Sequence, residues 1–493
     1  PRRPDPHRPP NGPGTGRADD GRGGEQMNTL QMAGHLAISR IRNARGHALL
    51  DTLAVVAFSV SSWLLLTTMG GVWMFYGRLG QLSARLEHLY GIPAHYTENM
   101  DRAYMALALL ALGLLIIPLL SLGASAARLG TNGRARRLAS LRLIGLSAGQ
   151  VNLMTLVETL IQAFVGFGIG LALYFASLPA WSHVTFTKLN IGTDEMLLPW
   201  WGFFLSAVLI ALITVGSTLV GLRRVAISPL GVSRRETPKA LKYWRVLGLV
   251  VTLPVLISTM RRLDGTTAIG NVVISALVFM TFFLTVSIVG ALFIQMSAKP
   301  AVRTANPAKL IGASRVLDDP RGAWRNISAV SLMALIASIV VFGISIAFNT
   351  GYADTDPDTT NLSLVLISDI TKGVSIALGF SLILGATSTL IHQASDVFDR
   401  ADESISLMKI GLPQSVLLKA RFWQVIPPLL LMLAVTTGLG GLLGIASGNT
   451  PRAENLSLLV WVVALGIALT IAAVMATVPI QARILSHHSR KND

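Results

Sequence analysis

The sequence predicts an all-α integral membrane protein with ten transmembrane helices in a four, two, four arrangement. Composition is the first observation. Of the 493 residues, 52% are hydrophobic and 13% are charged, whereas about a quarter of the residues of a soluble globular protein are charged. Too few charged side chains remain to cover a surface that faces water. The absence of cysteine excludes disulfides, thiolate metal sites and cysteine nucleophiles.

Ten apolar runs are the second observation. A helix needs about 20 apolar residues to span the hydrocarbon layer of a bilayer. The fifth run is the shortest and contains Pro254. The runs occupy residues 50–76, 103–127, 155–178, 199–222, 244–260, 270–296, 326–349, 370–393, 424–446 and 457–480. Ten crossings would place both termini on the same side of the membrane.

Basic residues assign that side. If the amino end lies inside, the inner segments hold 28 lysines and arginines and the outer connections hold 8. Positive residues are retained on the cytoplasmic side, so we expect a multi-pass protein of the bacterial cytoplasmic membrane with both termini in the cytoplasm. The same bias accounts for the net charge of +16 without a nucleic-acid partner.

A duplication is the third observation. The inner connection RARRLASLRLIGLSAGQV (134–151) aligns without gaps with RADESISLMKIGLPQSVL (400–417), and seven positions are identical. Each segment lies between the second and third crossings of a group of four. Because both groups begin inside, they are predicted to be parallel repeats related by an axis along the membrane normal. Each segment should be a short helix that ends at its glycine, Gly145 or Gly411.

The repeats divide the chain into four parts. Residues 1–26 are rich in Pro, Gly, Arg and Asp, so we expect a disordered extension, with Met27 as the natural start. Residues 27–243 would form the first four-helix repeat, residues 244–300 a two-helix insert, and residues 301–493 the second repeat. Each repeat should begin with an amphipathic elbow helix along the inner membrane surface, since LAISRIRNARGHAL and LIGASRVLDDPRGAWRNI precede the two groups.

The inner segment of the first repeat carries a family resemblance. An Arg-rich stretch, then Leu-Arg-x-Ile-Gly-Leu-Ser-x-x-Gln, then a helix with Glu158 that runs into glycines, resembles the FtsX/MacB-like permeases of ABC transporters. LRRVAISPLGVSRRETP (222–238) resembles the cytoplasmic exit of that family. The second copy departs from the pattern, because Pro413 replaces the serine and two acidic residues stand where the first copy has Arg136 and Arg137.

The resemblance implies two FtsX-like four-helix repeats in a permease subunit that is not itself an enzyme. A separate cytoplasmic ABC ATPase, in two copies, would bind ATP and Mg²⁺ and hold the two inner segments. This chain has no Gly-Lys dipeptide, which the phosphate-binding Walker A loop requires, and we expect no cofactor or metal in it. The residues implied to couple to the ATPase are Arg136, Arg137, Leu141, Arg142, Gly145 and Leu146, and Glu403, Leu407, Lys409, Gly411 and Leu412.

The substrate is constrained only by exclusion. The outer connections are too short for a large extracellular domain, which favours an amphiphilic, lipid-like or antimicrobial compound that enters laterally from the membrane lipid. Export, extraction, or force transmission across the membrane would all fit. Two alternatives stay open: an ion-driven secondary exporter, although the crossings hold few of the ionisable residues that ion coupling uses, and a sensory membrane protein that transports nothing. No substrate-binding residue is predicted.

Overall fold

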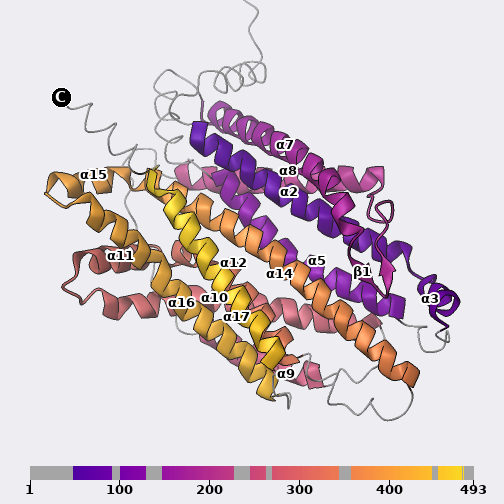
Figure 1. Ribbon diagram of the computed structural model, residues 1–493. Coiled ribbons are helices and arrows are strands. Elements are labelled where there is room, and N and C mark those ends of the chain that lie inside the picture. Colours follow the sequence, from indigo (N-terminus) through magenta and orange to yellow (C-terminus); the bar gives the residue numbers. More distant parts are fainter. Residues whose placement is uncertain are drawn as a thin grey trace, which may run out of the picture.

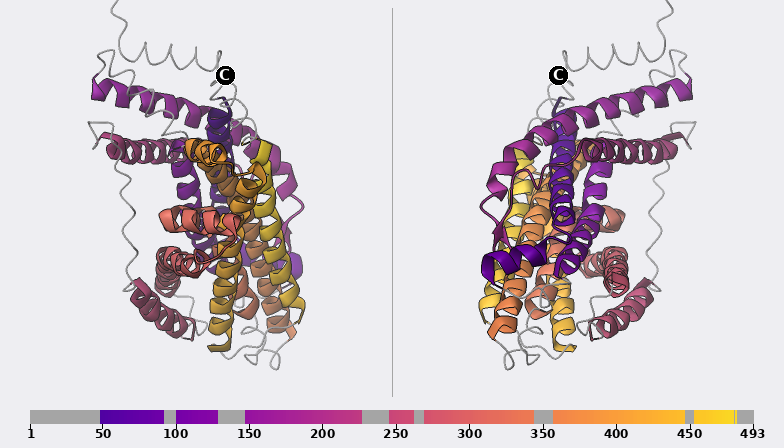
Figure 2. Two further views of the ribbon diagram at one scale, coloured as in Figure 1. Left: turned by 90° about the vertical axis from the view of Figure 1, so that its left-hand side faces the viewer. Right: turned by 90° about the vertical axis from the view of Figure 1, so that its right-hand side faces the viewer.

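Long helices make up nearly all of the chain that the computed structural model describes, and many run lengthwise through one bundle (Figures 1 and 2). The described residues are 48–91, 100–128, 147–226, 245–261, 269–343, 357–446, 453–479 and 481. The helices are α2 (Ala48–Gly77), α3 (Leu82–Tyr90), α5 (Met100–Arg128), α7 (Ala148–Trp181), α8 (Trp200–Ala226), α9 (Arg245–Arg261), α10 (Ile269–Ala301), α11 (Pro307–Asp318), α12 (Pro320–Gly343), α14 (Pro357–Asp399), α15 (Ala401–Lys409), α16 (Gln414–Ala446) and α17 (Ala453–Ala476).

Every predicted crossing coincides with one of these helices. Eight helices of the described residues are long and apolar enough to cross a membrane; the apolar stretches found in α5 and α9 are shorter, Tyr104–Gly113 and Arg245–Thr259. A helix satisfies its own backbone hydrogen bonds, which is why apolar segments of this length adopt it in lipid. An all-α multi-pass membrane protein is therefore confirmed, and the count of ten crossings in a four, two, four order stays a prediction.

Several predicted features fall outside the described residues. They are the extension 1–26, Met27, nearly all of the first elbow segment, the coupling residues of the first inner segment, and most of the exit 222–238. The second elbow is described as α11, a separate helix before α12. Asn306 caps it by accepting hydrogen bonds from the backbone N–H groups of Ala308 and Lys309 at 3.1 and 3.4 Å, and Pro307 follows at the first helical position.

Equivalent helices pack in the same way in the two halves of the chain. A Cβ atom at Gly170 of α7 would lie 2.7 Å from Ser62 Cβ and 2.9 Å from Trp63 N of α2. A Cβ atom at Gly440 of α16 would meet Ser338 and lie 3.0 Å from the backbone nitrogen of the next residue in α12. Both helix pairs thus approach closely at a glycine that faces a serine. The repeat that aligns residue 134 with residue 400 pairs Gly170 with Thr436, so the two halves share the close packing of these helices but not the glycine position, and the four-part boundaries stay a prediction.

The Ser-x-x-Gln of the first inner segment is a helix cap. Ser147 Oγ accepts from Gln150 N at 3.3 Å, and Gln150 Oε1 accepts from Ser147 N at 3.0 Å. This reciprocal pair is a capping box, which satisfies two backbone donors at the start of α7. The motif therefore has a local structural role.

α14 joins the two halves of the bundle. It extends over 43 residues, and its first turns lie on the amino side of the predicted eighth crossing. Leu384 and Ile391 of α14 pack in one core with Leu50 and Phe58 of α2. α15 directly follows α14 at one end of the bundle, whereas α3 and strand β1 lie toward the other end (Figure 1). We refer to these as the α15 end and the hairpin end.

A small antiparallel hairpin lies at the hairpin end between α7 and α8. It consists of β1 (Thr185–Phe186) and β2 (Leu189–Asn190). Its turn residues, Thr187 and Lys188, have φ angles of +54° and +60°, as the tight turns of two-residue hairpins require. The sequence analysis did not predict this hairpin, because two-residue strands leave too short a pattern to read.

Candidate coupling surface and inter-repeat cavity

α15 is the helical part of the second inner segment. Gly411 ends it in a left-handed conformation with φ +97°. Its N–H donates to Met408 O at 2.9 Å, and Leu412 N donates to Leu407 O at 3.1 Å. This pair of bonds is the Schellman motif that closes many helices. The predicted helix and its glycine stop are confirmed for this copy, and Gly145 of the other copy lies outside the described residues.

The predicted coupling residues of the second inner segment differ in exposure. Lys409 and Gly411 are exposed, whereas Glu403, Leu407 and Leu412 are partly buried. The sequence analysis missed Ile410, which is 84% exposed. Its position directly before the helix-ending Gly411 was the sequence signal, since a side chain there projects beyond the last turn of its helix. We call Met408, Ile410 and Leu412 the apolar tip.

Ion pairs brace α15 against its neighbours. Arg315 of α11, of which only 4% is exposed, donates from Nη2 to Glu403 Oε1 at 3.1 Å. Arg400 Nε donates to Asp396 Oδ1 at 2.8 Å, and its Nη1 lies 3.4 Å from Glu403 Oε2. Glu403 therefore faces inward and ties α15 to the elbow helix, so its direct role is to position α15.

Arg400 stays charged in these ion pairs. Burial by itself lowers the pKa of Arg400, but the carboxylates of Asp396 and Glu403 outweigh burial and raise that pKa above its ordinary value. Gln424 of α16 donates from Nε2 to Asp396 Oδ2 at 3.2 Å. Helices α11, α14, α15 and α16 are thus linked by charged and polar contacts, and a displacement of α15 would reach α14 directly.

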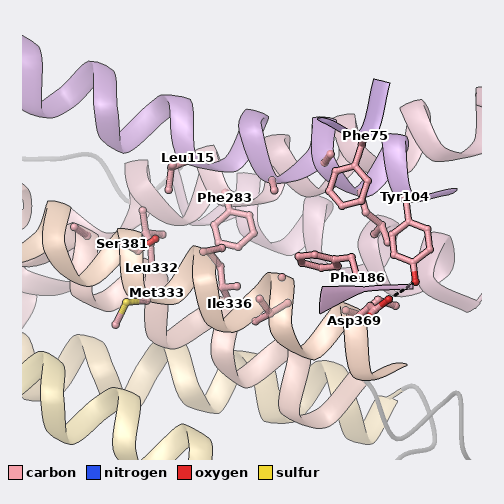
Figure 3. Close-up of a pocket in the computed structure, with 18 of the residues that line it drawn as sticks. Phe75, Tyr104, Leu115, Phe186, Phe283, Leu332, Met333, Ile336, Asp369 and Ser381 are labelled. Atoms are coloured by element: carbon pink, nitrogen blue, oxygen red, sulfur yellow. Dashed lines mark hydrogen bonds between the residues drawn. The ribbon is translucent and has the colours of Figure 1, made fainter. Parts of the chain in front are cut away.

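A cavity of about 220 Å³ lies between the two halves of the bundle (Figure 3). Phe75, Phe186 and Phe283 project toward it, and its lining is almost wholly apolar. It exists because the helices around it present small side chains, which leave space that larger residues would fill. The small lining residues are Ala108, Ala111, Ala329, Gly373, Ala377 and Ser381. The sequence analysis predicted no binding residue here.

A buried carboxylate closes the hairpin end of the cavity. Asp369 of α14, 2% exposed, accepts from the Tyr104 hydroxyl at 2.7 Å and from Thr187 N at 2.5 Å. Lys372 Nζ donates to Asp369 Oδ1 at 3.0 Å and to Thr185 O at 3.0 Å. We call this network the hairpin clamp, because it holds the hairpin of the first half against α14 of the second; Figure 3 shows its bond between Tyr104 and Asp369.

A second contact holds the same hairpin to α2. Arg78, 4% exposed, donates from Nη2 to Asn190 O at 3.1 Å and to Glu195 Oε2 at 2.5 Å. Burial by itself raises the pKa of Glu195, but Arg78, together with hydrogen bonds from the Gly192 backbone and Arg85, outweighs burial and lowers that pKa. Within the described residues, no group of three or more His, Asp or Glu side chains is arranged to hold a metal ion.

One part of the chain matches a known family. Residues 124–230 match the family model of the FtsX-like permease C-terminal domain. The chain contains an FtsX-like permease domain. The matched region begins near the end of α5 and includes the first inner segment, α7, the hairpin and α8. No curated protein sequence matches the chain.

FtsX-like permeases are non-enzymatic membrane subunits of ABC transporters, and the family generally works with a cytoplasmic ABC ATPase. The second inner segment, with α15, lies outside the matched residues. Its likeness to the first inner segment therefore rests on the internal sequence repeat.

Proposed function

We propose that this FtsX-like permease receives force from two copies of a separate ATPase, through α15 and the equivalent segment 134–151. ATP and Mg²⁺ would be bound by the ATPase. The force would drive export or extraction of an amphiphilic compound from the bacterial cytoplasmic membrane. The α15 end would face the cytoplasm, since the predicted inner segments carry most of the basic residues.

The apolar tip carries the proposal. Ile410 is 84% and Met408 is 38% exposed at the end of a helix, and burying both against a partner would remove apolar surface from water. The Schellman bonds of Gly411 fix the direction of the tip, and the Arg315 and Arg400 ion pairs fix the helix beneath it. α15 thus combines an exposed contact with a rigid base, as a lever requires.

Co-purification with the ATPase tests the proposal. Ile410→Asp should abolish retention of the ATPase, because a charge would have to be buried in the contact. Ile410→Leu keeps an apolar side chain of the same size and should retain the ATPase. If Ile410→Asp inserts, folds and keeps a full complement of ATPase, the docking assignment for α15 is wrong.

Asp369 is the residue that the ion-driven alternative would use. It is an ionisable side chain buried within a membrane-spanning helix, where such groups often serve ion coupling. However, Tyr104, Thr187 and Lys372 all donate to it, as expected of a structural clamp. Substrate flux in liposomes that follows a pH gradient without ATP would revive the alternative. A complex that hydrolyses ATP and moves nothing would favour the sensory one.

A further inference from the structure

We infer that the cavity between the two halves binds the acyl chain of a membrane phospholipid, which enters sideways between α5 and α10. The inference deepens the proposed function by naming the class of bound molecule and its site. It depends on that function only for what happens to the lipid after binding. The binding step itself needs no ATPase.

The cavity has the size and chemistry of an apolar chain site. Its volume of about 220 Å³ exceeds the ~150 Å³ of an apolar protein cavity that holds benzene. Its lining runs along α14 from Asp369 to Ser381, which corresponds to roughly 18 Å at 1.5 Å per residue. A second apolar space of about 120 Å³ shares Phe75, Phe186 and Ala377 with it. The two spaces therefore lie next to each other, with these shared residues between them.

The mouth of the cavity opens toward lipid. Leu107 of α5 and Leu284 of α10 line the cavity, yet they are 37% and 51% exposed. Leu277 and Ile288 share a face of α10 with Leu284 and are exposed as well. An apolar helix face in a membrane-spanning segment lies against lipid tails. A chain of the surrounding bilayer can therefore enter without crossing a polar surface.

Among the described residues, the one charged group that lines the cavity lies at its hairpin end. At the hairpin end, Asp369 already accepts from Tyr104, Thr187 and Lys372. Because both oxygens of this buried carboxylate already accept hydrogen bonds, it needs no polar group from a ligand. Phe186 of the clamped hairpin faces the same space (Figure 3). The hairpin clamp thus forms the wall of the cavity at the hairpin end.

A photoreactive phospholipid tests the site in the purified chain without ATPase. The probe is a phosphatidylcholine with a diazirine in one acyl chain, placed in nanodiscs. Met333 lines the cavity but is only 1% exposed, so label on Met333 reports a chain inside it. We expect label on Met333 in the native chain, and at least about tenfold less in Ala377→Phe, since the added ring fills space that the chain needs.

Two further variants make the result decisive. Ser375→Phe places the same ring on an exposed position of α14 that does not line the cavity, and it should label Met333 like the native chain. Ala111→Phe fills the cavity from α5. Its labelling of Met333 replaces that of Ala377→Phe if the latter protein is not monodisperse. Absence of label on Met333 in the native chain, or full label in a folded filled variant, would overturn the inference. Neither result bears on ATPase retention at Ile410.

Discussion

The Tyr104 hydroxyl donates to Asp369 Oδ2 at 2.7 Å, although the two residues are 265 positions apart in the sequence. One lies on α5 of the first half and the other on α14 of the second. Thr187 of the hairpin donates its backbone N–H to the same oxygen. The two halves of the permease are therefore joined at the hairpin end by one carboxylate, directly over the apolar cavity.

Asp369→Asn should destabilise the protein by about 1–3 kcal/mol, the usual cost when a buried hydrogen-bonded group loses a partner. The amide oxygen can still accept from Tyr104 and Thr187, but an NH₂ group replaces the oxygen that accepts from Lys372. Tyr104→Phe removes one donor and should cost about 1 kcal/mol. Thermal unfolding of the detergent-solubilised chain measures both. Ser375→Ala, on an exposed position of α14, is the control, and an equal effect of Asp369→Asn and the control would refute the clamp.

Acid should loosen the contact between α2 and the hairpin. The pKa of Glu195 in the folded protein is lower than its ordinary value of 4.5. The carboxylate then stabilises the fold fully at pH values above 4.5, and this contribution is lost as the pH falls through the folded pKa. The unfolding temperature measured between pH 7 and pH 3 should fall more steeply for the native chain than for Glu195→Gln. Parallel curves for the two proteins would contradict this prediction.

Alanine should lower the stability of the protein at Gly170 and Gly440, but not at the glycines two positions earlier in each helix. Gly170→Ala and Gly440→Ala place a methyl group against α2 and α12 at sub-contact distance, which should cost about 1–3 kcal/mol. A Cβ at Gly168 or Gly438 meets nothing within 4 Å, and alanine there should be neutral or slightly stabilising in a helix. The unfolding temperatures of the four variants check this. If Gly440→Ala unfolds at the same temperature as the native chain, the close contact between α16 and α12 at this glycine is contradicted.

The buried Arg315 pair should matter more than an exposed pair nearby. Arg315→Met leaves Glu403 without its partner on α11 and should lower stability by about 1–3 kcal/mol. Arg325, 42% exposed and 3.7 Å from Asp319, is the matched control, since exposed pairs contribute about 0–1 kcal/mol. Thermal unfolding separates the two. If Arg315→Met unfolds no earlier than Arg325→Met, the brace beneath α15 contributes nothing measurable.

Local features of the candidate site could be read from the sequence. Gly411 was predicted to end a helix because a left-handed residue after the last turn is a property of a few consecutive residues. The repeat of 134–151 at 400–417 is equally local, since it needs only an alignment. In contrast, the sequence placed Asp369 in an outer connection, one residue before the predicted crossing. The i, i+3 spacing of Asp369 and Lys372 was its one visible signal.

The sequence by itself determined the all-α membrane class, the positions of the helices and the FtsX-like character, because apolar run length, charge bias and short motifs are local or additive properties. Tertiary structure alone decided that Glu403 faces Arg315, that Asp369 holds the hairpin, and that small residues of α5, α12 and α14 leave a cavity. Those facts depend on how helices distant in sequence pack against one another, and the packing angle and register of two helices are fixed only when all their side chains meet at once.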